Sequence, residues 1–412
     1  MSNTKYLIIG NSAAAIGGVQ GIRQADPDGS ITLVASEPYH TYSRPLISYY
    51  LEGRVDREHM HYRKEDFYKN NAVETILGMG VKGIDPAGHM ATLDDGSTIT
   101  YEKCLIATGS NPFVPPIQGR ETAKNAFTFT KMDDALGIEK ILTPESRVVI
   151  LGAGLIGLKA AEALVDQCES ITVVDLADRV LPSVLDAECA AIMADYLMGL
   201  GLTLKLQTSI SAIGDGEVTL SDGTTQPYDI LVLAVGTRPA SALAEEAGAK
   251  CERGIVTDVH QRTSLGDVFA AGDCTQSHDI SSGSEKNIAI LPNAFMQGET
   301  AGINMAGGDE AYAIAFPVNS MGIKNYYMLT AGSYTGEPIE IEKDGTLRKF
   351  YISDDELKGY IIMGDCQRGG IYTDLIRNHI KLSATDWRML LEEPQLAAFP
   401  LEDRKAKLAR AH

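Results

Sequence analysis

The sequence has few cysteines for its length. Across 412 residues there are six, and no two of them stand in a Cys-x-x-Cys spacing. This set is too sparse for a disulfide scaffold, and it lacks the paired spacing of zinc sites, iron–sulfur clusters and redox dithiols. We therefore expect reduced, mostly structural thiols at Cys104, Cys168, Cys189, Cys251, Cys274 and Cys366.

Long apolar stretches are also missing. The longest runs, such as those at 147–151 and 229–235, are far shorter than the roughly 20 residues of a membrane-spanning helix. The N-terminus, Met-Ser-Asn-Thr-Lys, leads directly into a predicted strand, without the basic region and the apolar stretch of a secretory signal. These features predict a cytoplasmic protein that does not bind a membrane.

Positive charge is scarce. The chain has 36 Lys and Arg against 55 Asp and Glu, which gives a formal charge of −19. Nucleic acids and anionic membranes are therefore not expected as partners, because both are bound by cationic patches. With 44% hydrophobic and 22% charged residues, the composition is that of a globular protein. At about 150 residues per domain, the length suggests two or three domains.

No proline- or serine-rich linker divides the chain, but a turn of small residues that begins with Gly10 follows its first predicted strand. A predicted strand at 5–9 is apolar after Lys5, a helical run then extends to Ala25, and a second strand at 31–36 is followed by Glu37. This pattern predicts a βαβ unit that binds a dinucleotide. Small residues let a pyrophosphate approach the backbone, the helix N-terminus supplies free N–H groups, and the acid accepts hydrogen bonds from a ribose. The fingerprint is incomplete, because Ser12 and Ala15 stand where glycines are usual.

The pattern recurs near residue 150 in complete form. The predicted strand 147–151 is followed by Gly152-Ala-Gly154-Leu155-Ile156-Gly157, and a second strand at 171–174 ends at Asp175. Two such units in one chain predict two bound dinucleotides. Turn signals at Asn111-Pro112 and from Gly236 to Pro239 suggest boundaries between the parts.

Beyond about residue 320 the pattern changes. Alternating strands are joined by predicted hairpin turns at Asp344-Gly345 and Asp354-Asp355, and a helix is predicted from Ile371 to His379. This stretch predicts a third domain of α+β type.

Several segments together resemble a known family. They are the Gly10 unit, Tyr42-Ser-Arg44-Pro45-Leu-Ile-Ser48, Ala107-Thr108-Gly109, the Gly152 unit, Asp267-Val-Phe-Ala-Ala-Gly272-Asp273, and Leu291-Pro-Asn-Ala-Phe-Met-Gln-Gly298. The chain resembles the pyridine nucleotide-disulfide oxidoreductases over nearly its whole length. Within them it is most similar to the NADH:rubredoxin and ferredoxin reductases and to the flavin domain of assimilatory nitrite reductases.

The resemblance implies an α/β fold with two Rossmann-like dinucleotide-binding domains, arranged as in glutathione reductase, and a C-terminal α+β domain. FAD would bind a discontinuous domain of residues 1–112 and 245–320. NAD would bind residues 113–244, and residues 321–412 would form an interface domain. Whether the protein is a monomer or a homodimer stays open.

The resemblance also implies the cofactor contacts. For FAD they are Gly10, Asn11, Ser12, Ala13, Glu37, Arg44, Pro45, Val81, Ala107, Thr108, Gly109, Gly272, Asp273 and Leu291; for NAD they are Gly152, Gly154, Leu155, Ile156, Gly157, Asp175 and Gly236. Asp273 would bind the flavin ribityl chain, although an aspartate after a glycine is also a common turn residue. Asp175 favours NADH, because it would bind a free 2′-hydroxyl and repel a 2′-phosphate, whereas Arg179 could bind such a phosphate.

The chain departs from the family at two places near the flavin. Disulfide and peroxidase members carry reactive cysteines just after the first unit, but residues 37–53 contain none, so a thiol mechanism lacks its nucleophile. Cys274, next to Asp273, is the one thiol that could lie near the flavin. Many relatives also carry a Lys–Glu ion pair beside the flavin, whose positions here correspond to Tyr49 and Lys159. We hypothesise that Lys159 raises the flavin potential and that Tyr49 packs or hydrogen-bonds beside it; the alternative is that Lys159 is a solvated helix residue.

The predicted function follows from these parts. NADH would pass a hydride to the flavin, and electrons would then move to or from a small carrier protein of rubredoxin or ferredoxin type. An NADH oxidase and a non-catalytic flavin-binding redox sensor are the alternatives. An acidic carrier would need a local basic patch on this acidic chain. The candidate segments contain Arg54, Arg57, Arg63, Lys64 and Lys69, or Arg404, Lys405, Lys407 and Arg410.

Overall fold

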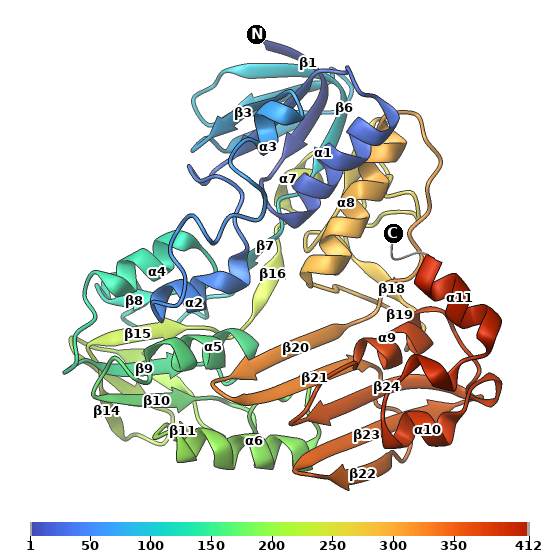
Figure 1. Ribbon diagram of the computed structural model, residues 1–412. Helices are drawn as coiled ribbons and strands as arrows, with labels where there is room; N and C mark the ends of the chain where they lie inside the picture. Colours follow the sequence, from blue (N-terminus) through green and yellow to red (C-terminus); the bar gives the residue numbers. More distant parts are fainter. Residues whose placement is uncertain (1, 410–412) are drawn as a thin grey trace. The chain divides into compact units, whose positions relative to one another are not determined.

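The computed structural model of the chain describes residues 2–409 (Figure 1). Its residues form two compact units. The first comprises the chain up to Ser277 together with Leu291–Tyr312, and the second comprises His278–Ile290 and the chain from Ala313 onward. The first unit contains both predicted dinucleotide-binding regions. The domain boundaries expected from the sequence, which divide this unit further, stay a prediction.

A seven-stranded sheet organises the N-terminal part of the first unit. Its strand order is β3-β2-β1-β6-β5-β4, with β17 also pairing with β6. The pairs β1/β2, β2/β3, β1/β6 and β6/β17 are parallel, whereas β4/β5 and β5/β6 are antiparallel. The bounds are β1 (Ser2–Ile9), β2 (Ile31–Ala35), β3 (Val73–Leu77), β4 (Val81–Asp85), β5 (Met90–Leu93), β6 (Thr98–Ile106) and β17 (Val268–Ala270).

Two long helices, α1 (Ala13–Ala25) and α8 (Leu291–Met305), pack against each other in the first unit (Figure 1). They approach closely because each carries glycines at the contact. A Cβ on Gly298 would lie 1.9 Å from the Ala14 carbonyl oxygen, and one on Gly21 would lie 2.1 Å from that of Glu299. Any larger side chain would therefore push the two helices apart. The segment from Leu291 to Gly298, which is part of the family resemblance, lies in α8.

A five-stranded parallel sheet forms the middle of the chain, in the order β11-β10-β9-β15-β8. Its three central strands β10, β9 and β15 are almost wholly buried, as expected where helices cover a parallel sheet. The bounds are β8 (Ala126–Phe127), β9 (Arg147–Leu151), β10 (Ser170–Val174), β11 (Thr203–Lys205) and β15 (Ile230–Leu233), with helices α4 (Met132–Glu139), α5 (Leu155–Leu164) and α6 (Ala187–Gly199). The predicted strand, glycine turn and helix at residues 147–157 are confirmed.

Smaller elements complete the first unit. A short ladder pairs β7 (Ser110–Pro112) with β16 (Thr237–Pro239), and a three-stranded sheet contains β12 (Ile210–Ile213), β13 (Glu217–Leu220) and β14 (Thr225–Pro227). The short helices are α2 (Ile47–Leu51), α3 (Phe67–Asn70) and α7 (Ala242–Glu246), and the 3₁₀ turns are η1 (Arg44–Leu46) and η2 (Arg120–Thr122). Helix α2 packs against α4 and α5.

The second unit has an antiparallel sheet in the order β20-β21-β24-β23-β22, and helix α9 packs against β24. The predicted hairpin turns and the predicted helix are confirmed here. The bounds are β18 (Ser277–Asp279), β19 (Ser284–Lys286), β20 (Val318–Ile323), β21 (Tyr326–Gly332), β22 (Ile339–Lys343), β23 (Thr346–Ser353), β24 (Glu356–Met363), α9 (Gly370–Arg377), η3 (Leu382–Ala384), α10 (Trp387–Glu392), η4 (Leu396–Ala398) and α11 (Leu401–Ala409).

Candidate functional site

A cleft of about 390 Å³ lies at the carboxyl ends of the parallel strands β1, β2 and β6. Its lining comes from segments far apart in the sequence, at 9–14, 34–44, 79–81, 107–111, 130–131, 240–243 and 271–273, and from α8. Ligands of open parallel sheets bind at this edge, because the turns after the strands meet there. The cleft therefore occupies the position at which a dinucleotide is expected.

The cleft brings together almost all residues predicted to bind FAD. Thirteen of the fourteen line it, whereas Pro45, in the turn η1, is not among the lining residues. Glu37 lies two residues beyond the end of β2 and reaches the cleft from there. These cofactor contacts stay predictions. The N-terminal segment and the pair Gly272–Asp273, which are far apart in the sequence, nevertheless line the same cleft.

The glycine turn after β1 has the geometry that a close backbone approach requires. Gly10 has a φ of +126°, and a Cβ there would lie 2.1 Å from the carbonyl oxygen of Ala107. Ser12 is the N-cap residue of α1, and its side chain makes no capping hydrogen bond. The first N–H groups of this 13-residue helix therefore remain available to an anionic group such as a pyrophosphate.

Glu37 and Arg44 form an ion pair at the cleft. Arg44 Nη2 lies 2.5 Å from Glu37 Oε1, and Arg44 Nη1 donates to the carbonyl oxygen of Thr130 at 3.0 Å. The hydroxyl of Tyr42 donates to the other carboxylate oxygen of Glu37 at 2.6 Å. Burial raises the pKa of this hydroxyl, so it remains protonated and acts as a donor.

Asp273 presents a carboxyl group in a largely dehydrated part of the cleft. Burial raises its pKa, while Ser110, whose Oγ lies 3.4 Å from Asp273 Oδ2, and the charge of Arg44 act in the opposite direction. A carboxyl group held in this way can bind the hydroxyl groups of a sugar or a sugar alcohol. This chemistry suits the ribityl role that the resemblance implies.

The predicted NAD residues gather at the carboxyl edge of the five-stranded sheet. Gly152 has a φ of +115°, and a Cβ on Gly157 would lie 2.0 Å from the Gly152 carbonyl oxygen. Gly154 is the N-cap residue of α5, whose first turn contains Leu155 and Ile156. Gly236, after β15, has a φ of +108°. The backbone thus has the close turn of a dinucleotide-binding site, although the nucleotide contacts stay predictions.

Asp175 is hydrogen-bonded to the glycine turn that begins at Gly152. Its carboxylate accepts hydrogen bonds from the backbone N–H groups of Ala153, at 2.6 Å, and Ala177, at 2.7 Å. Each carboxylate oxygen can accept a further hydrogen bond. Asp175 is therefore positioned by the backbone and can still bind a ribose.

Lys159 lies on α5 and packs against Tyr49, as predicted. Its Nζ is 4.5 Å from the centroid of the Tyr49 ring, and the guanidinium carbon of Arg54 is 4.4 Å from the same centroid. Lys159 also donates to Glu162, whose side chain is 2% exposed. Lys159 and Tyr49 are not among the residues that line the cleft, and the proposed effect of Lys159 on the flavin stays a prediction.

Cys274, the thiol next to the predicted flavin ligand Asp273, is not exposed for reaction. Cys274 is fully buried, and its Sγ donates to the carbonyl oxygen of Ala271 at 3.3 Å. Burial raises its pKa to about 11, so the reactive thiolate is scarce near neutral pH. All six cysteines are free, and no cysteine is among the residues described as lining the cleft.

Sequence reasoning missed several residues of the cleft. Tyr42 belongs to a segment that resembles the family, but the sequence indicates no role for it, and Thr130 and Lys131 come from the segment just before α4. Thr130 Oγ1 is buried and has no hydrogen-bond partner within the described part of the chain. An orphaned hydroxyl of this kind suits a polar ligand atom. Together with the glycine turn, Glu37 and Asp273, it shows that the cleft fits a dinucleotide such as FAD.

Between residues 2 and 409, no helix is both long and apolar enough to cross a membrane. In the same range, no three His, Cys, Asp or Glu side chains are grouped so that they could hold a metal ion.

The fold and the two glycine turns define a flavoprotein oxidoreductase with two dinucleotide sites. Residues 4–298 match the family described as pyridine nucleotide-disulphide oxidoreductase. The chain belongs to this family, as the resemblance predicted. It is an FAD-dependent enzyme that uses NAD(H) as a substrate.

Known proteins with related sequences cover most of the chain. The epsilon subunit of the NADH-dependent phenylglyoxylate dehydrogenase of Aromatoleum evansii is 31% identical over 396 residues, which are 93% of this chain and 94% of that protein. The ferredoxin–NAD(+) reductase subunit of the benzene 1,2-dioxygenase system of Pseudomonas putida is 31% identical over 345 residues, 82% and 83% of the two chains. The crystal structure of a covalent putidaredoxin reductase–putidaredoxin complex is similar in fold, with a TM-score of 0.86, 23% identity and 99% of each chain covered.

Proposed function

We propose that this enzyme transfers electrons between NADH and a small carrier protein of ferredoxin or rubredoxin type, without a redox-active cysteine. The observation that carries this proposal is a dinucleotide cleft whose described lining contains no thiol, beside a Cys274 that is fully buried. Disulfide chemistry requires an accessible thiolate. The electrons must therefore leave through the cofactor itself.

The residues of the chain would bind, orient and exclude water. The turn at Gly10 and the N-terminus of α1 would hold the pyrophosphate of FAD, Glu37 a ribose, and Asp273 the ribityl chain. FAD, when bound, accepts a hydride from NADH and can pass electrons on one at a time. No side chain has to act as acid, base or nucleophile in hydride transfer between stacked rings.

Two relatives favour a protein as the acceptor. One is named as a ferredoxin–NAD(+) reductase subunit, and the other is a subunit of an NADH-dependent dehydrogenase. Both names describe a subunit of a larger enzyme or enzyme system, which supports a carrier protein or a partner subunit over a small molecule as the acceptor.

The proposed basic segments do not by themselves explain how an acidic carrier would dock. Between residues 52 and 69 the five cations are matched by five acids, Glu52, Asp56, Glu58, Glu65 and Asp66. Near the C-terminus, Arg404 and Lys405 follow Glu402 and Asp403. Arg410 lies outside the described residues, and the side chain of Lys407 is not described. The net charge of the first segment is zero, so this segment adds no local repulsion to an acidic carrier but also supplies no local attraction.

An anaerobic titration with NADH, followed by flavin absorbance, tests the proposal. The reduced protein is then mixed separately with ferredoxin, rubredoxin and air-saturated buffer. We expect fast bleaching by NADH and fast reoxidation by one of the carrier proteins. Fastest reoxidation by dioxygen would identify an NADH oxidase instead. Failure to bleach, or slow reoxidation by every acceptor, would leave a flavin-binding sensor.

A further inference from the structure

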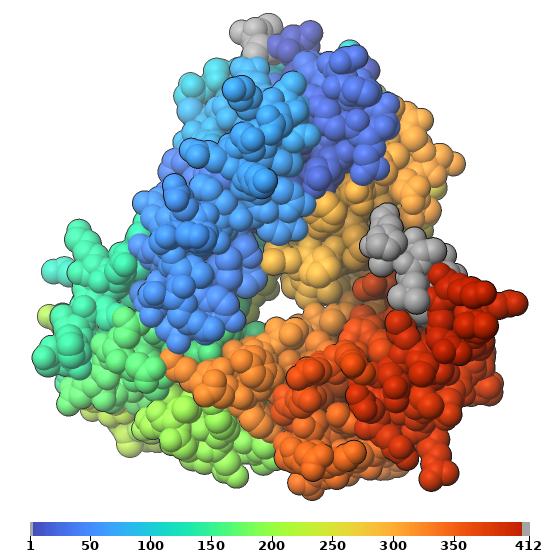
Figure 2. Space-filling view, in the orientation of Figure 1, coloured from blue at the N-terminus to red at the C-terminus, as the bar shows by residue number. Residues whose placement is uncertain are grey.

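Three tyrosine hydroxyls from one short segment contact helix α4. Tyr39 donates to Asp133, Tyr50 donates to Glu139 Oε2 at 2.8 Å, and Tyr42 accepts from the backbone N–H of Met132 at 3.1 Å. Helix α2, which contains Tyr50, packs against α4 and α5 (Figure 1). In the space-filling view, the blue surface of this segment lies against the green surface of the α4 and α5 region (Figure 2). The segment thus joins the FAD-binding part to the NAD-binding part.

Tyr42 differs from the other two tyrosines. Its side chain is 7% exposed, whereas the hydrogen bonds of Tyr39 and Tyr50 lie at the surface. Its hydroxyl donates to Glu37 Oε2 at 2.6 Å, accepts from Met132 N at 3.1 Å, and accepts from Arg44 Nη1 at 3.3 Å. A phenol has one proton and two lone pairs. All three are therefore used, and they connect a predicted FAD ligand to the first residue of α4.

The ion pair between Arg44 and Glu37 has further hydrogen bonds at each of its two members, because Glu37 accepts from Tyr42. Arg44 also donates to the carbonyl oxygen of Thr130 at 3.0 Å, two residues before Met132. Moving the start of α4 would therefore disturb the Tyr42 hydroxyl and the Arg44 guanidinium together. Because both groups hold the carboxylate of Glu37, such a movement would also disturb the predicted ribose ligand.

We infer that Tyr42 is a positioning residue that couples FAD binding to the placement of α4. The inference rests on the proposed function, in which FAD occupies the cleft. The Tyr42 hydroxyl positions Glu37 to bind the ribose, and it also fixes the N-terminus of α4. Coupling is reciprocal, so FAD binding must also protect the Met132 amide that bonds to Tyr42.

The first test compares Tyr42→Phe with Tyr50→Phe. Both variants keep the ring and lose one hydroxyl that bonds to α4, but only the Tyr42 hydroxyl also bonds to Glu37. The dissociation constant for FAD is measured by fluorescence on protein stripped of flavin. Amide hydrogen exchange at Met132 is measured with and without FAD. We expect Tyr42→Phe to raise the dissociation constant about tenfold and to abolish the protection by FAD, and Tyr50→Phe to leave both unchanged.

A second pair of variants tests the amide without touching the tyrosine. Met132 is the first residue of α4, a position where proline is tolerated because its N–H is not used by the helix. Met132→Ala and Met132→Pro both lose the buried side chain, but only the proline also loses the N–H that bonds to Tyr42. We expect the proline variant to bind FAD several-fold more weakly than the alanine variant. In a Tyr42→Phe background this difference should vanish.

Every outcome decides one of the two proposals. If the original chain does not bind FAD, the proposed function fails. If it binds FAD but Tyr42→Phe binds as well as Tyr50→Phe and keeps the protection at Met132, the coupling is wrong. If Tyr42→Phe does not fold, the two Met132 variants decide alone, and equal FAD affinity of the two would overturn the inference.

Discussion

Lys159 and Glu162 stand three residues apart on α5, and the lysine ammonium donates to a carboxylate that is 2% exposed. The positive charge that was predicted to act on the flavin is thus paired with a negative charge on the same helix. The ammonium also lies 4.5 Å from the Tyr49 ring centroid, where the ring face attracts a cation. Removing either charge alone should therefore have a larger effect than removing both.

The first prediction concerns stability. Lys159→Met should lower the free energy of unfolding by at most about 3 kcal/mol, because the buried carboxylate of Glu162 loses the cation that donates to it while the charge of Arg54 still acts on it. The double variant Lys159→Met/Glu162→Gln should recover most of this loss, since no charge is then left in the pair. Urea unfolding of the three proteins measures both values. A double variant as unstable as the single one would show that packing, and not charge, holds this site.

The second prediction concerns the flavin potential. Lys159→Met should lower the potential and slow the reduction by NADH, because it leaves the negative charge of Glu162 in place of a neutral pair. The double variant should stay close to the original chain. Spectroelectrochemical titration of the flavin gives the potential. If both single and double variants keep the original potential and rate, Lys159 has no role in tuning the flavin.

The third prediction concerns the contact between α1 and α8. Gly298→Ala should destabilise the protein by about 1–3 kcal/mol and weaken FAD binding, because the new Cβ would lie 1.9 Å from the Ala14 carbonyl oxygen in the first turn of α1. Gly199→Ala is the matched control. It lies in α6, where a Cβ would meet nothing within 4 Å, so it should stabilise the helix slightly. Thermal unfolding and flavin release check both variants, and equal effects would contradict the close packing.

The sequence revealed the parts of the site that depend on local spacing. The turns at Gly10 and Gly152 could be predicted because strand, glycine and helix follow one another within a few residues. The place of Asp273 beside Gly10 came from the family resemblance, since β17 and β1 are far apart in the chain and do not pair directly.

Contacts between the two nucleotide-binding parts were not predictable. The bond between Tyr42 and the Met132 amide joins residues 90 positions apart, and no local pattern indicates it. The same holds for the orphaned hydroxyl of Thr130 at the cleft. The Lys159–Glu162 pair is different. Its spacing of three residues on a predicted helix is a pattern that indicates an ion pair on that helix. The prediction instead assigned the charge of Lys159 to the flavin.

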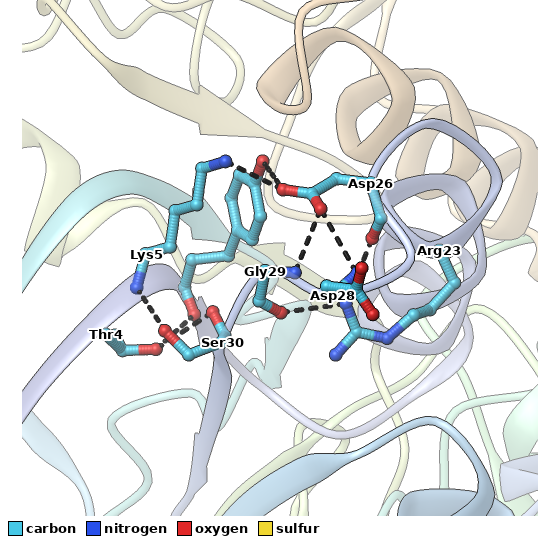
Figure 3. A network of polar contacts seen from close by, with 8 residues as sticks. Thr4, Lys5, Arg23, Asp26, Asp28, Gly29 and Ser30 are labelled. Carbon is cyan, nitrogen blue, oxygen red and sulfur yellow. Dashed lines mark hydrogen bonds and ion pairs between the residues drawn. The ribbon is translucent and has the colours of Figure 1, made fainter.

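The last prediction concerns acid stability and a network between the middle of β1 and Asp26 at the C-terminal end of α1. Figure 3 shows Lys5 and Asp26 facing each other, with Gly29 beside them. Asp26 Oδ2 lies 2.7 Å from Lys5 Nζ and accepts from the Tyr6 hydroxyl at 2.8 Å, and Oδ1 accepts from Gly29 N at 2.9 Å. The hydrogen bond from Lys5, then those from Tyr6 and Gly29, hold the pKa of Asp26 well below its ordinary value.

A lowered pKa fixes the sign of the pH dependence. The contribution of Asp26 to stability is fully present above the pKa of an unfolded aspartate, about 3.9, and is lost as the pH falls through the lower value of the folded state. Asp26→Asn should therefore be less stable than the original chain at pH 6, and the gap should narrow towards pH 2. Asp28→Asn is the control, because the Asp28 backbone N–H, and not its carboxylate, bonds to Asp26. Urea unfolding at several pH values measures the gap. A gap that is the same at pH 6 and pH 2 would show that the network acts through packing and not through the charge of Asp26.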